Sequence, residues 1–364
     1  MERGAAASMT AGTDFEPPLG EPLAGELRRA RRRWLITGVA GFIGSHLLET
    51  LLVRDQEVVG LDDFSTGSRA NLEDVRARVG EERWRSFRLR HADIRSLVAC
   101  REAVHGAEVV LHQAALGSVP RSIEYPLETH SVNVLGTVNV LEAARLEGRP
   151  RIVYASSSAI YGDDAGLPKI EERRGRSLSP YAASKVAGEL AAAAYRRAYG
   201  LEVVGLRYFN VFGPRQRPDG PYAAVIPRWI GAFIEGRPVT IYGDGETSRD
   251  FCYVANAVQA NLLAALVPGP SALESVMNVA VGRRTTLRKL LEEIRARLAR
   301  VVPEAANQQP VHAPFRPGDV RDSEADISRA ERLLGYRPSH DLEAGLDETV
   351  SWFLRRRPGG VAGV

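Results

Sequence analysis

Cysteine is scarce in this sequence, and long hydrophobic segments are absent. Cys100 and Cys252 are the only cysteines among 364 residues, which is too few for a disulfide framework or a cysteine-ligated zinc site and agrees with a reducing compartment. The longest uncharged run, residues 251–273, contains three amide side chains and two prolines, so it does not resemble a membrane-spanning helix. The N-terminus lacks the compact apolar core of a secretory signal. We therefore expect a cytoplasmic protein without a metal site.

Neither sign of charge dominates. Lys and Arg total 48 and Asp and Glu total 45, so the formal net charge is +3. This balance argues against a protein that binds nucleic acid through a basic face. Hydrophobic residues make up 44% of the chain, which is enough to fill a sizeable core and excludes a disordered chain. At roughly 150 residues per domain, the length allows two domains, or one large α/β domain with an appendage.

Residues 1–33 differ in composition from the rest of the chain. They are rich in Ala, Gly, Pro and Glu and end in a run of arginines, so we expect a mobile or weakly helical extension whose charges face solvent rather than a partner. From Trp34 onward, short apolar runs alternate with helical patterns. The predicted strands cover residues 57–61, 109–111, 152–154 and 203–206, and the predicted helices cover residues 42–53, 134–146 and 182–199. This alternation predicts an α/β fold with a doubly wound parallel sheet that carries helices on both faces.

The later part of the chain has a different composition. Proline, glycine and arginine become frequent after Asn210, and an apolar stripe from Leu287 to Leu298 predicts an amphipathic helix packed on a core. We expect a first domain over residues 34–209, to which residues 250–282 return. Residues 210–249 and 283–364 then form a smaller α/β substrate domain.

Three glycines mark a phosphate-binding turn. Gly38, Gly41 and Gly44 lie three residues apart, after the first strand and at the start of the first long helix. In such a turn the first glycine permits the sharp bend, the second admits a pyrophosphate and the third lets the helix pack on the sheet. The helix N-terminus favours the negative charge. Glycine also serves ordinary turns, but the strand–turn–helix context predicts a dinucleotide site in a Rossmann domain.

The ends of the next strands supply further candidate contacts. Asp62 follows the second strand, where a carboxylate accepts hydrogen bonds from the ribose of NAD and repels the extra phosphate of NADP. An ordinary turn aspartate is the alternative, and nearby Arg69 complicates the choice of cofactor. Asp93 follows the third strand and is placed to meet the adenine. Small residues after the fourth strand let the cofactor lie against backbone, at Gln113, Ala114 and Ala115.

Two later motifs suggest acid–base chemistry. Tyr181 and Lys185 are four residues apart and share a helix face, so we expect the ammonium to lower the pKa of the phenol and make it a usable base. A serine run at 156–158 lies just past a strand end, where ligands bind in such sheets. Each motif alone has an accidental alternative, a chance pair or a Ser-rich loop. Their order after the glycine turn and Asp62 favours a catalytic site.

The chain from about Trp34 to Trp352 resembles the extended short-chain dehydrogenase/reductase family. Within that family it is similar to the nucleotide-sugar 4-epimerases, particularly bacterial UDP-N-acetylglucosamine 4-epimerases. The resemblance is carried by residues 38–44, HQAALGSVPRS (112–122), LRYFNVFG (206–213), GDGETSRDF (243–251) and RPGDVRDSEAD (316–326).

The resemblance implies roles for individual residues. Ser157 matches the family's catalytic serine, Tyr181 its base and Lys185 the partner of that base. The implied NAD contacts are Gly38, Gly41, Phe42, Ile43, Gly44, Asp62, Asp93, Ile94, Gln113, Ala114, Ala115, Tyr181, Lys185 and Tyr208. The implied UDP-sugar contacts are Gly117, Ser118, Ser157, Ser158, Asn210, Gln216, Arg249, Arg316, Asp319 and Ser323. Relatives usually dimerise through two helices, and the helices after His130 and Pro180 are the candidates for a homodimer.

The resemblance also implies a reaction. Tyr181, aided by Ser157, removes the proton of the sugar's 4-hydroxyl, and a 4-keto sugar forms, turns over and is reduced on its other face. Dehydratases of the family carry Asp-Glu where this chain has Ser158-Ala159, and decarboxylases carry Glu at 159, so both activities are disfavoured. A net oxidoreductase and a non-catalytic dinucleotide sensor remain as rival classes.

The choice of sugar depends on one small residue. Ser323 occupies a position where narrower relatives have Tyr, so we expect UDP-GlcNAc and UDP-GalNAc as substrates, and UDP-glucose and UDP-galactose as well. A sugar with a carboxylate at carbon 6 is the alternative, with Arg121 or another cation to bind it.

Overall fold

The computed structural model describes residues 19–220, 222–266, 276–315 and 320–356. Its centre is a parallel sheet of seven strands in the order β11-β6-β5-β4-β1-β2-β3, so the chain reverses direction across the sheet between β1 and β4. The strands are β1 Arg33–Thr37, β2 Glu57–Asp62, β3 Phe87–His91, β4 Val109–His112, β5 Arg151–Ser157, β6 Val203–Tyr208 and β11 Val276–Val279. The expected doubly wound parallel sheet is therefore confirmed.

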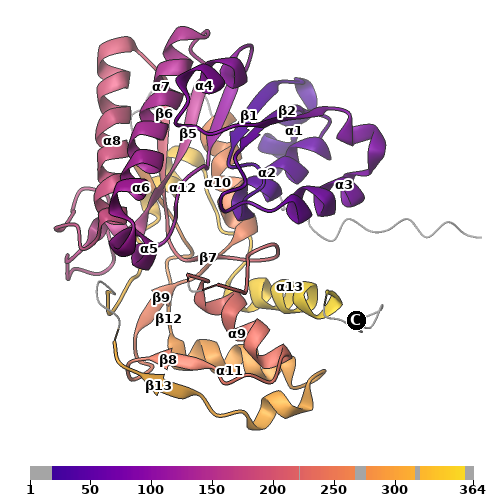
Figure 1. Cartoon of the computed structure of the whole chain (residues 1–364), viewed down its shortest axis with the longest axis vertical. Helices are drawn as coiled ribbons and strands as arrows, with labels where there is room; N and C mark the ends of the chain where they lie inside the picture. Colours follow the sequence, from indigo (N-terminus) through magenta and orange to yellow (C-terminus); the bar gives the residue numbers. More distant parts are fainter. Residues whose placement is uncertain (1–18, 221, 267–275, 316–319, 357–364) are drawn as a thin grey trace, which may run out of the picture.

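Helices cover both faces of this sheet (Figure 1). On one face lie α4 Leu97–Val104, α7 Gly136–Leu146 and α8 Pro180–Tyr199, and on the other lie α1 Glu21–Arg29, α2 Phe42–Leu52, α3 Arg69–Trp84 and α10 Val254–Leu266. Helices α2, α4, α8 and α10 contact the strands directly, whereas α3 packs on α2 and α1 on α10. The strands are buried on both faces, as their β-branched and leucine-rich sequences require. Shorter segments connect β4 to α7 and β5 to α8: α5 Val119–Glu124, α6 Pro126–His130, the π-helical turn η1 Ser131–Leu135 and the 3₁₀ turn η2 Ser158–Tyr161.

The described part of the N-terminal extension is packed, which corrects the expectation of a solvated segment. Helix α1 lies against α10. Leu23 and Leu27 are four residues apart, share one helix face and are buried. Arg32 pairs with Glu26, side chain to side chain, at 2.5 Å. The extension therefore contributes apolar surface to the core.

A smaller lobe lies beyond the carboxyl ends of the strands (Figure 1). It contains three two-stranded pairings, β7 with β10, β9 with β12 and β8 with β13. Its elements are β7 Val211–Phe212, α9 Val225–Ile234, β8 Thr240–Tyr242, β9 Ser248–Asp250, β10 Cys252–Tyr253, β12 Arg284–Thr286, α11 Leu287–Leu298, η3 Pro303–Asn307, β13 Val311–Ala313 and α13 Leu342–Arg355. Helix α12, Ser328–Leu334, instead packs on β11 and α10 beside the central sheet. The predicted apolar stripe of α11 is buried at Leu290, Leu291, Ile294 and Leu298.

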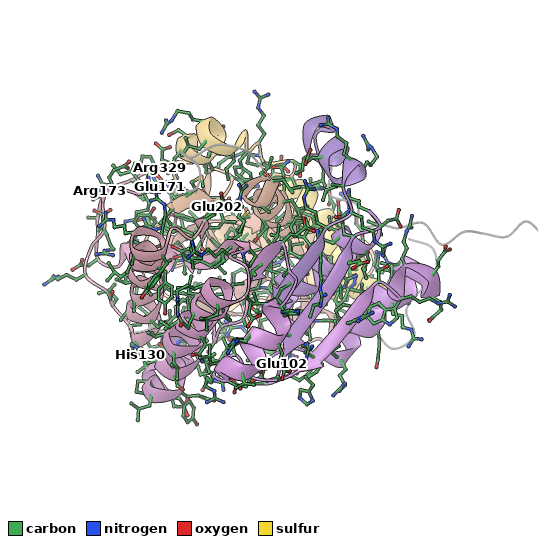
Figure 2. All side chains as sticks on the ribbon, turned by 90° about the horizontal axis from the view of Figure 1, so that it is seen from above. Glu102, His130, Glu171, Arg173, Glu202 and Arg329 are labelled. Atoms are coloured by element: carbon green, nitrogen blue, oxygen red, sulfur yellow. The ribbon has the colours of Figure 1, made fainter. Side chains whose placement is uncertain are left out.

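The loop between η2 and α8 ties the two parts together. The backbone of Lys169 pairs with the segment at Ala325, and Glu171 lies 3.8 Å from Arg329 of α12, a grouping visible in Figure 2. Because these contacts join distant parts of the chain, they fix the smaller lobe against the edge of the sheet. None of the helices in the described residues has the length and apolarity that a membrane span needs.

Candidate active site

A cavity of about 610 Å³ lies at the carboxyl ends of the parallel strands, between the sheet and the smaller lobe. It brings together nearly all of the predicted site residues: Gly38, Gly41, Phe42, Ile43, Gly44, Asp62, Asp93, Ile94, Gln113, Ala114, Ala115, Gly117, Ser157, Ser158, Tyr181, Lys185, Tyr208, Asn210, Gln216, Arg249 and Ser323. Ser118 lines an adjoining cavity instead. Arg316 and Asp319 lie outside the described residues.

The glycine turn is shaped so that a dinucleotide can lie close to the backbone. Gly38 has φ +70°, and a Cβ there would lie 2.8 Å from the backbone nitrogen of Ala114. A Cβ on Gly44 would overlap the carbonyl oxygen of Gly38. Helix α2 begins after Gly41 without a side-chain cap, so its first N–H groups have no partner within the helix. The turn therefore offers N–H donors and a helix dipole to an anionic group.

Asp62 serves the turn and also faces the cavity. Its two carboxylate oxygens accept hydrogen bonds from the backbone N–H groups of Ala40 and Phe64, both at 2.8 Å. Burial raises the pKa of this carboxyl, and the two N–H donors oppose that rise. A carboxylate has further lone pairs, so these bonds leave room for a ribose hydroxyl. Asp62 therefore stabilises the turn, as the alternative interpretation expected. It also lines the cavity, so the predicted contact with NAD stays compatible with this position.

The ends of β4 and β6 carry a closed hydrogen-bond network. The Tyr208 hydroxyl donates to Oε1 of Gln113 at 3.1 Å and accepts from Nδ2 of Asn261 at 2.6 Å, while Nε2 of Gln113 donates to Oδ1 of Asn261 at 3.0 Å. These side chains hold one another in place at the cavity wall. The sequence offered no signal for Asn261, because it comes from α10, far along the chain.

Ser157 and Tyr181 line the same cavity, and the Ser157 hydroxyl is close enough to the phenol to lower its pKa. Ser157 ends β5, and its Oγ also accepts from the backbone N–H of Ala159 at 3.2 Å. Tyr181 lies in the first turn of α8, whose N-terminus is capped by the Ser179 side chain. Burial raises the pKa of Tyr181, and the nearby Ser157 hydroxyl opposes this rise. The expectation of a lowered pKa is therefore wrong for the protein alone, because desolvation of the phenol is the larger effect.

Lys185 is fixed against the strand end. Its Nζ donates to the carbonyl oxygen of Ala155 at 2.8 Å and lies 5.9 Å from the centroid of the Tyr181 ring. Burial lowers the pKa of this ammonium to about 8, and the negative charge of Glu189 opposes the fall. Lys185 is therefore positively charged at neutral pH, one helical turn from the phenol.

The smaller lobe contributes polar groups to the opposite wall. Gln216 donates through Nε2 to the carbonyl oxygen of Val211 at 3.2 Å, and its Oε1 is buried without a hydrogen-bond partner among the described residues. Buried polar atoms are nearly always paired, so a ligand donor is the expected partner. Ser323 presents a small side chain to the cavity. Arg249 reaches both cavities from β9.

The adjoining cavity has a volume of about 280 Å³ and shares Gly117, Asn210, Gln216 and Arg249 with the first. Aromatic side chains form much of its lining: Phe212, Tyr222, Trp229, Tyr242, Phe251 and Phe315. The lining also includes Arg228, whose guanidinium lies 5.5 Å from the centroid of the Tyr242 ring. The two cavities together can accept an elongated ligand with an aromatic group at one end.

Asn133 in η1 is a supporting residue that sequence reasoning missed. Its side chain pairs with the backbone N–H and C=O of Leu116, at 2.8 and 3.1 Å, and donates to the Ser184 hydroxyl at 3.0 Å. Asn133 therefore joins the loop before Gly117 to helix α8, which carries Tyr181 and Lys185. Arg121, named as a candidate for a sugar carboxylate, instead binds both oxygens of Glu128 and lines neither cavity.

Comparison with known proteins identifies a family model and relatives that match most of this chain. Residues 34–280 match the model of the NAD dependent epimerase/dehydratase family. A UDP-glucose 4-epimerase of Mycolicibacterium smegmatis is 38% identical over 325 residues, which cover 89% of this chain and 99% of the relative.

Two solved structures have the same fold. A UDP-N-acetylglucosamine 4-epimerase from Methanobrevibacter ruminantium, in complex with UDP-N-acetylmuramic acid, superposes with a TM-score of 0.79 at 35% identity and covers 90% of this chain and 99% of its own. A UDP-glucose 4-epimerase from Thermus thermophilus, in complex with NAD, has a TM-score of 0.76 at 37% identity. The match covers 90% of this chain and 100% of the Thermus chain.

Proposed function

Because the chain belongs to the NAD-dependent epimerase/dehydratase family, we propose that it interconverts UDP-sugars at carbon 4, with UDP-GlcNAc and UDP-GalNAc as its principal pair. The observation that carries this proposal is that Ser157, Tyr181, Lys185 and the glycine turn line one cavity at the carboxyl ends of the strands. These side chains come from different strand ends and a helix, and they face a common space.

The cofactor of this family is NAD, and the residues of the sheet fit it. The turn from Gly38 to Gly44 would hold the pyrophosphate, since side chains there would collide with backbone. Asp62 would accept from the adenosine ribose, and Asp93 lies toward the adenine end, where Arg95 lowers the pKa of its carboxyl. When bound, NAD supplies the acceptor and donor of the carbon-4 hydride.

Tyr181 and Ser157 would move the proton of the 4-hydroxyl. The serine hydroxyl both donates and accepts, so it can pass a proton between the sugar and the nearby phenol. Only the ionised phenolate can take this proton, and burial raises the pKa of Tyr181. The positive charge that Lys185 carries at neutral pH would stabilise the phenolate during the reaction. The same two groups would return the proton to the sugar after its ketone has turned over.

The smaller lobe would bind the nucleotide and leave the sugar room to turn. The aromatic residues of the second cavity suit a pyrimidine base, and the guanidinium of Arg249 suits the pyrophosphate. Arg316 and Asp319, outside the described residues, remain predicted contacts of UDP. Gln216 has a free buried acceptor for a hydroxyl or an amide N–H of the sugar, and the small Ser323 leaves space for an N-acetyl group.

The structure supports a neutral carbon 6 better than a carboxylate. Among the described residues that line the two cavities, the cations are Lys185, Arg228 and Arg249. Lys185 belongs to the proton-transfer group and Arg249 to the proposed pyrophosphate site. Arg228 lines only the aromatic cavity proposed for the base, where it lies over the Tyr242 ring. Arg121 is neutralised by Glu128. A UDP-uronic acid 4-epimerase and a net oxidoreductase are the alternatives.

We also propose a homodimer that forms through the helices after His130 and Pro180. The turn η1, which follows His130, and helix α8 contact each other and expose leucines, with Leu135 49% and Leu190 60% exposed. A partner subunit would cover this apolar surface. Cytoplasmic location stays a prediction from the sequence.

Incubation of the purified protein with a panel of UDP-sugars, with no coenzyme added, tests the function. We expect UDP-GlcNAc and UDP-GalNAc to interconvert with no net change in NADH absorbance. In a parallel incubation to which NAD is added, its stoichiometric consumption would favour the oxidoreductase. Conversion only of UDP-glucuronic acid would favour the uronate enzyme. No conversion of any sugar would overturn the proposal.

A further inference from the structure

Asp250 is a buried carboxylate next to a residue of the proposed substrate site. It ends β9 and is 0% exposed, whereas its neighbour Arg249 faces the cavities. Because side chains alternate along a strand, the two residues point in opposite directions. Asp250 lines neither cavity, so the proposed reaction does not use it directly.

Four backbone N–H groups surround this carboxylate. Oδ1 accepts from Val281 at 3.0 Å, and Oδ2 accepts from Gly282 at 3.0 Å, from Arg283 at 3.2 Å and from Ala325 at 3.2 Å. The donors come from two segments more than 40 residues apart in the sequence. Asp250 therefore joins three pieces of chain: β9, the loop after β11 and the segment that contains Ser323.

Each of the three pieces positions part of the site. Strand β9 carries Arg249, and the segment at 323 runs alongside it, with the Ser323 N–H donating to the carbonyl oxygen of Ser248 at 3.1 Å. The loop after β11 continues directly from the central sheet, whose strand β11 pairs with β6. The carboxylate thus connects the substrate-facing wall to the sheet that would hold the cofactor.

The negative charge is kept here at a cost in stability. Burial raises the pKa of Asp250 to about 6, although the four N–H donors oppose the rise. Above pH 6 the folded protein therefore holds an ionised group that would be more stable in water. The titratable neighbours are Cys252 and Tyr336, whose pKa values burial also raises, so both stay neutral at physiological pH. Charged residues on the adjoining segments are Arg283, whose N–H is one of the donors, Arg284, the strand partner of Asp250, and Glu324, which lies 3.6 Å from Arg284.

We propose that Asp250 is a positioning residue that fixes Arg249 and Ser323 against the end of β11, and so sets the binding of the UDP moiety. This inference rests on the proposed function, because it requires UDP to contact Arg249. Asp250 acts only through the backbone that it holds, and no proton of the reaction passes through it.

The Asp250→Asn variant tests the inference. An amide keeps the shape but replaces one carboxylate oxygen with a donor that faces N–H groups, so the three segments separate slightly. We expect the Kd for UDP, measured by calorimetry, and the KM for UDP-GlcNAc to rise at least about tenfold, while kcat changes by less than about threefold and the NAD content per subunit is unchanged. Asp341→Asn is the matched control, because Asp341 is exposed, accepts from the Ala344 N–H at 2.9 Å and lies away from both cavities.

An unchanged Kd for UDP in a folded Asp250→Asn protein would overturn the inference, as would equal losses of NAD and UDP binding. If the variant does not fold, the wild-type protein supplies the test. Its Kd for UDP-GlcNAc, whose doubly esterified pyrophosphate does not titrate in this range, should rise as the pH falls from 7.5 to 5, because Asp250 gains a proton near pH 6 and loses an acceptor. A Kd that stays constant over this range would contradict the inference. Failure of the wild-type protein to bind UDP at any pH would instead overturn the proposed function.

Discussion

Arg207 and Glu189 form a two-point ion pair in the interior, with Nε and Nη2 of the arginine each 2.9 Å from a carboxylate oxygen. The Glu189 carboxylate also accepts from the Ser156 hydroxyl at 2.6 Å. Glu189 lies one turn after Lys185 on α8, and Ser156 precedes Ser157. The pair therefore lies directly behind the proposed catalytic residues and links the helix to the ends of β5 and β6.

Loss of this pair should destabilise the fold. In Glu189→Gln the guanidinium of Arg207 stays buried without a compensating charge, so we expect the free energy of unfolding to fall by about 3 kcal/mol. Urea denaturation followed by circular dichroism measures this. Glu81→Gln is the control, since Glu81 pairs with Arg76 at the surface, where both side chains are more than half exposed, and it should leave the midpoint nearly unchanged. Equal midpoints for the two variants would contradict the assigned role of the buried pair.

The Tyr181→Phe variant should lose sugar interconversion while it still binds NAD and UDP. Removal of the hydroxyl takes away the group that would share a proton with Ser157, and general acid–base catalysis contributes roughly 100- to 10,000-fold. The measurement is kcat with UDP-GlcNAc together with the NAD content of the purified variant. Tyr195→Phe is matched to it, because Tyr195 lies on the same helix but contacts Tyr199 and lines neither cavity. Near-normal turnover of Tyr181→Phe would remove the phenol from the mechanism.

The stability of a Lys185→Met variant should depend on pH in a defined window. The pKa of Lys185 is lowered from 10.5 to about 8 by burial, so the charged form is disfavoured in the folded protein relative to the unfolded chain. Below pH 8 this costs the wild-type protein on the order of 3 kcal/mol. As the pH rises from 8 to 10.5 the folded protein releases its proton first, and the cost disappears.

As the pH rises from 8 to 10.5, the wild-type protein should therefore become more stable relative to Lys185→Met, as measured by the difference between their free energies of unfolding. Paired urea titrations at pH 7.5, 9 and 10.5 measure it, and the comparison cancels other groups that titrate in both proteins. A difference that does not change with pH would show that the Lys185 ammonium is not destabilised by burial.

The cofactor turn and the proposed catalytic residues could be predicted from the sequence, because each of these motifs consists of residues that are close together in the chain. The glycine turn from Gly38 to Gly44, the strand-end position of Asp62 and the four-residue spacing of Tyr181 and Lys185 each depend on a few neighbouring residues. The predicted helix over 134–146 begins at Gly136 instead, because the preceding residues form the π-helical turn η1.

The rest depends on contacts between distant segments, which periodicity does not reveal. Gln216 has a buried, unpaired oxygen only because its loop packs below the cavity, and Asp250 meets its donors only when β9 lies beside the loop after β11. Strands of two or three residues, such as β8 and β13, are too short to show an alternating pattern. The pKa direction of Tyr181 was predicted wrongly because sequence spacing contains no information on desolvation.

Charged substitutions on η1 and α8 test the proposed homodimer. Leu135→Lys combined with Leu190→Lys places two ammonium groups on the apolar surface that a second copy would cover, so we expect a monomer in analytical ultracentrifugation where the wild-type protein is a dimer. Val311→Lys is the control, because Val311 is 53% exposed on β13 of the smaller lobe. A wild-type monomer, or a dimer that survives both substitutions, would contradict the proposed interface.

Enlarging Ser323 should separate N-acetylated from plain sugars. Ser323 is 9% exposed and lies at the cavity wall, so a tyrosine there would take the space proposed for the N-acetyl group. In Ser323→Tyr we expect kcat/KM for UDP-GlcNAc to fall at least about tenfold more than for UDP-glucose, since a pocket separates such substituents by about 1–3 kcal/mol. Ser323→Ala, which removes the hydroxyl without filling space, should keep the preference of the wild-type protein. Equal losses on both sugars in Ser323→Tyr would show that position 323 does not select the substituent, and a loss of selectivity in Ser323→Ala would assign the selection to the hydroxyl instead of to size.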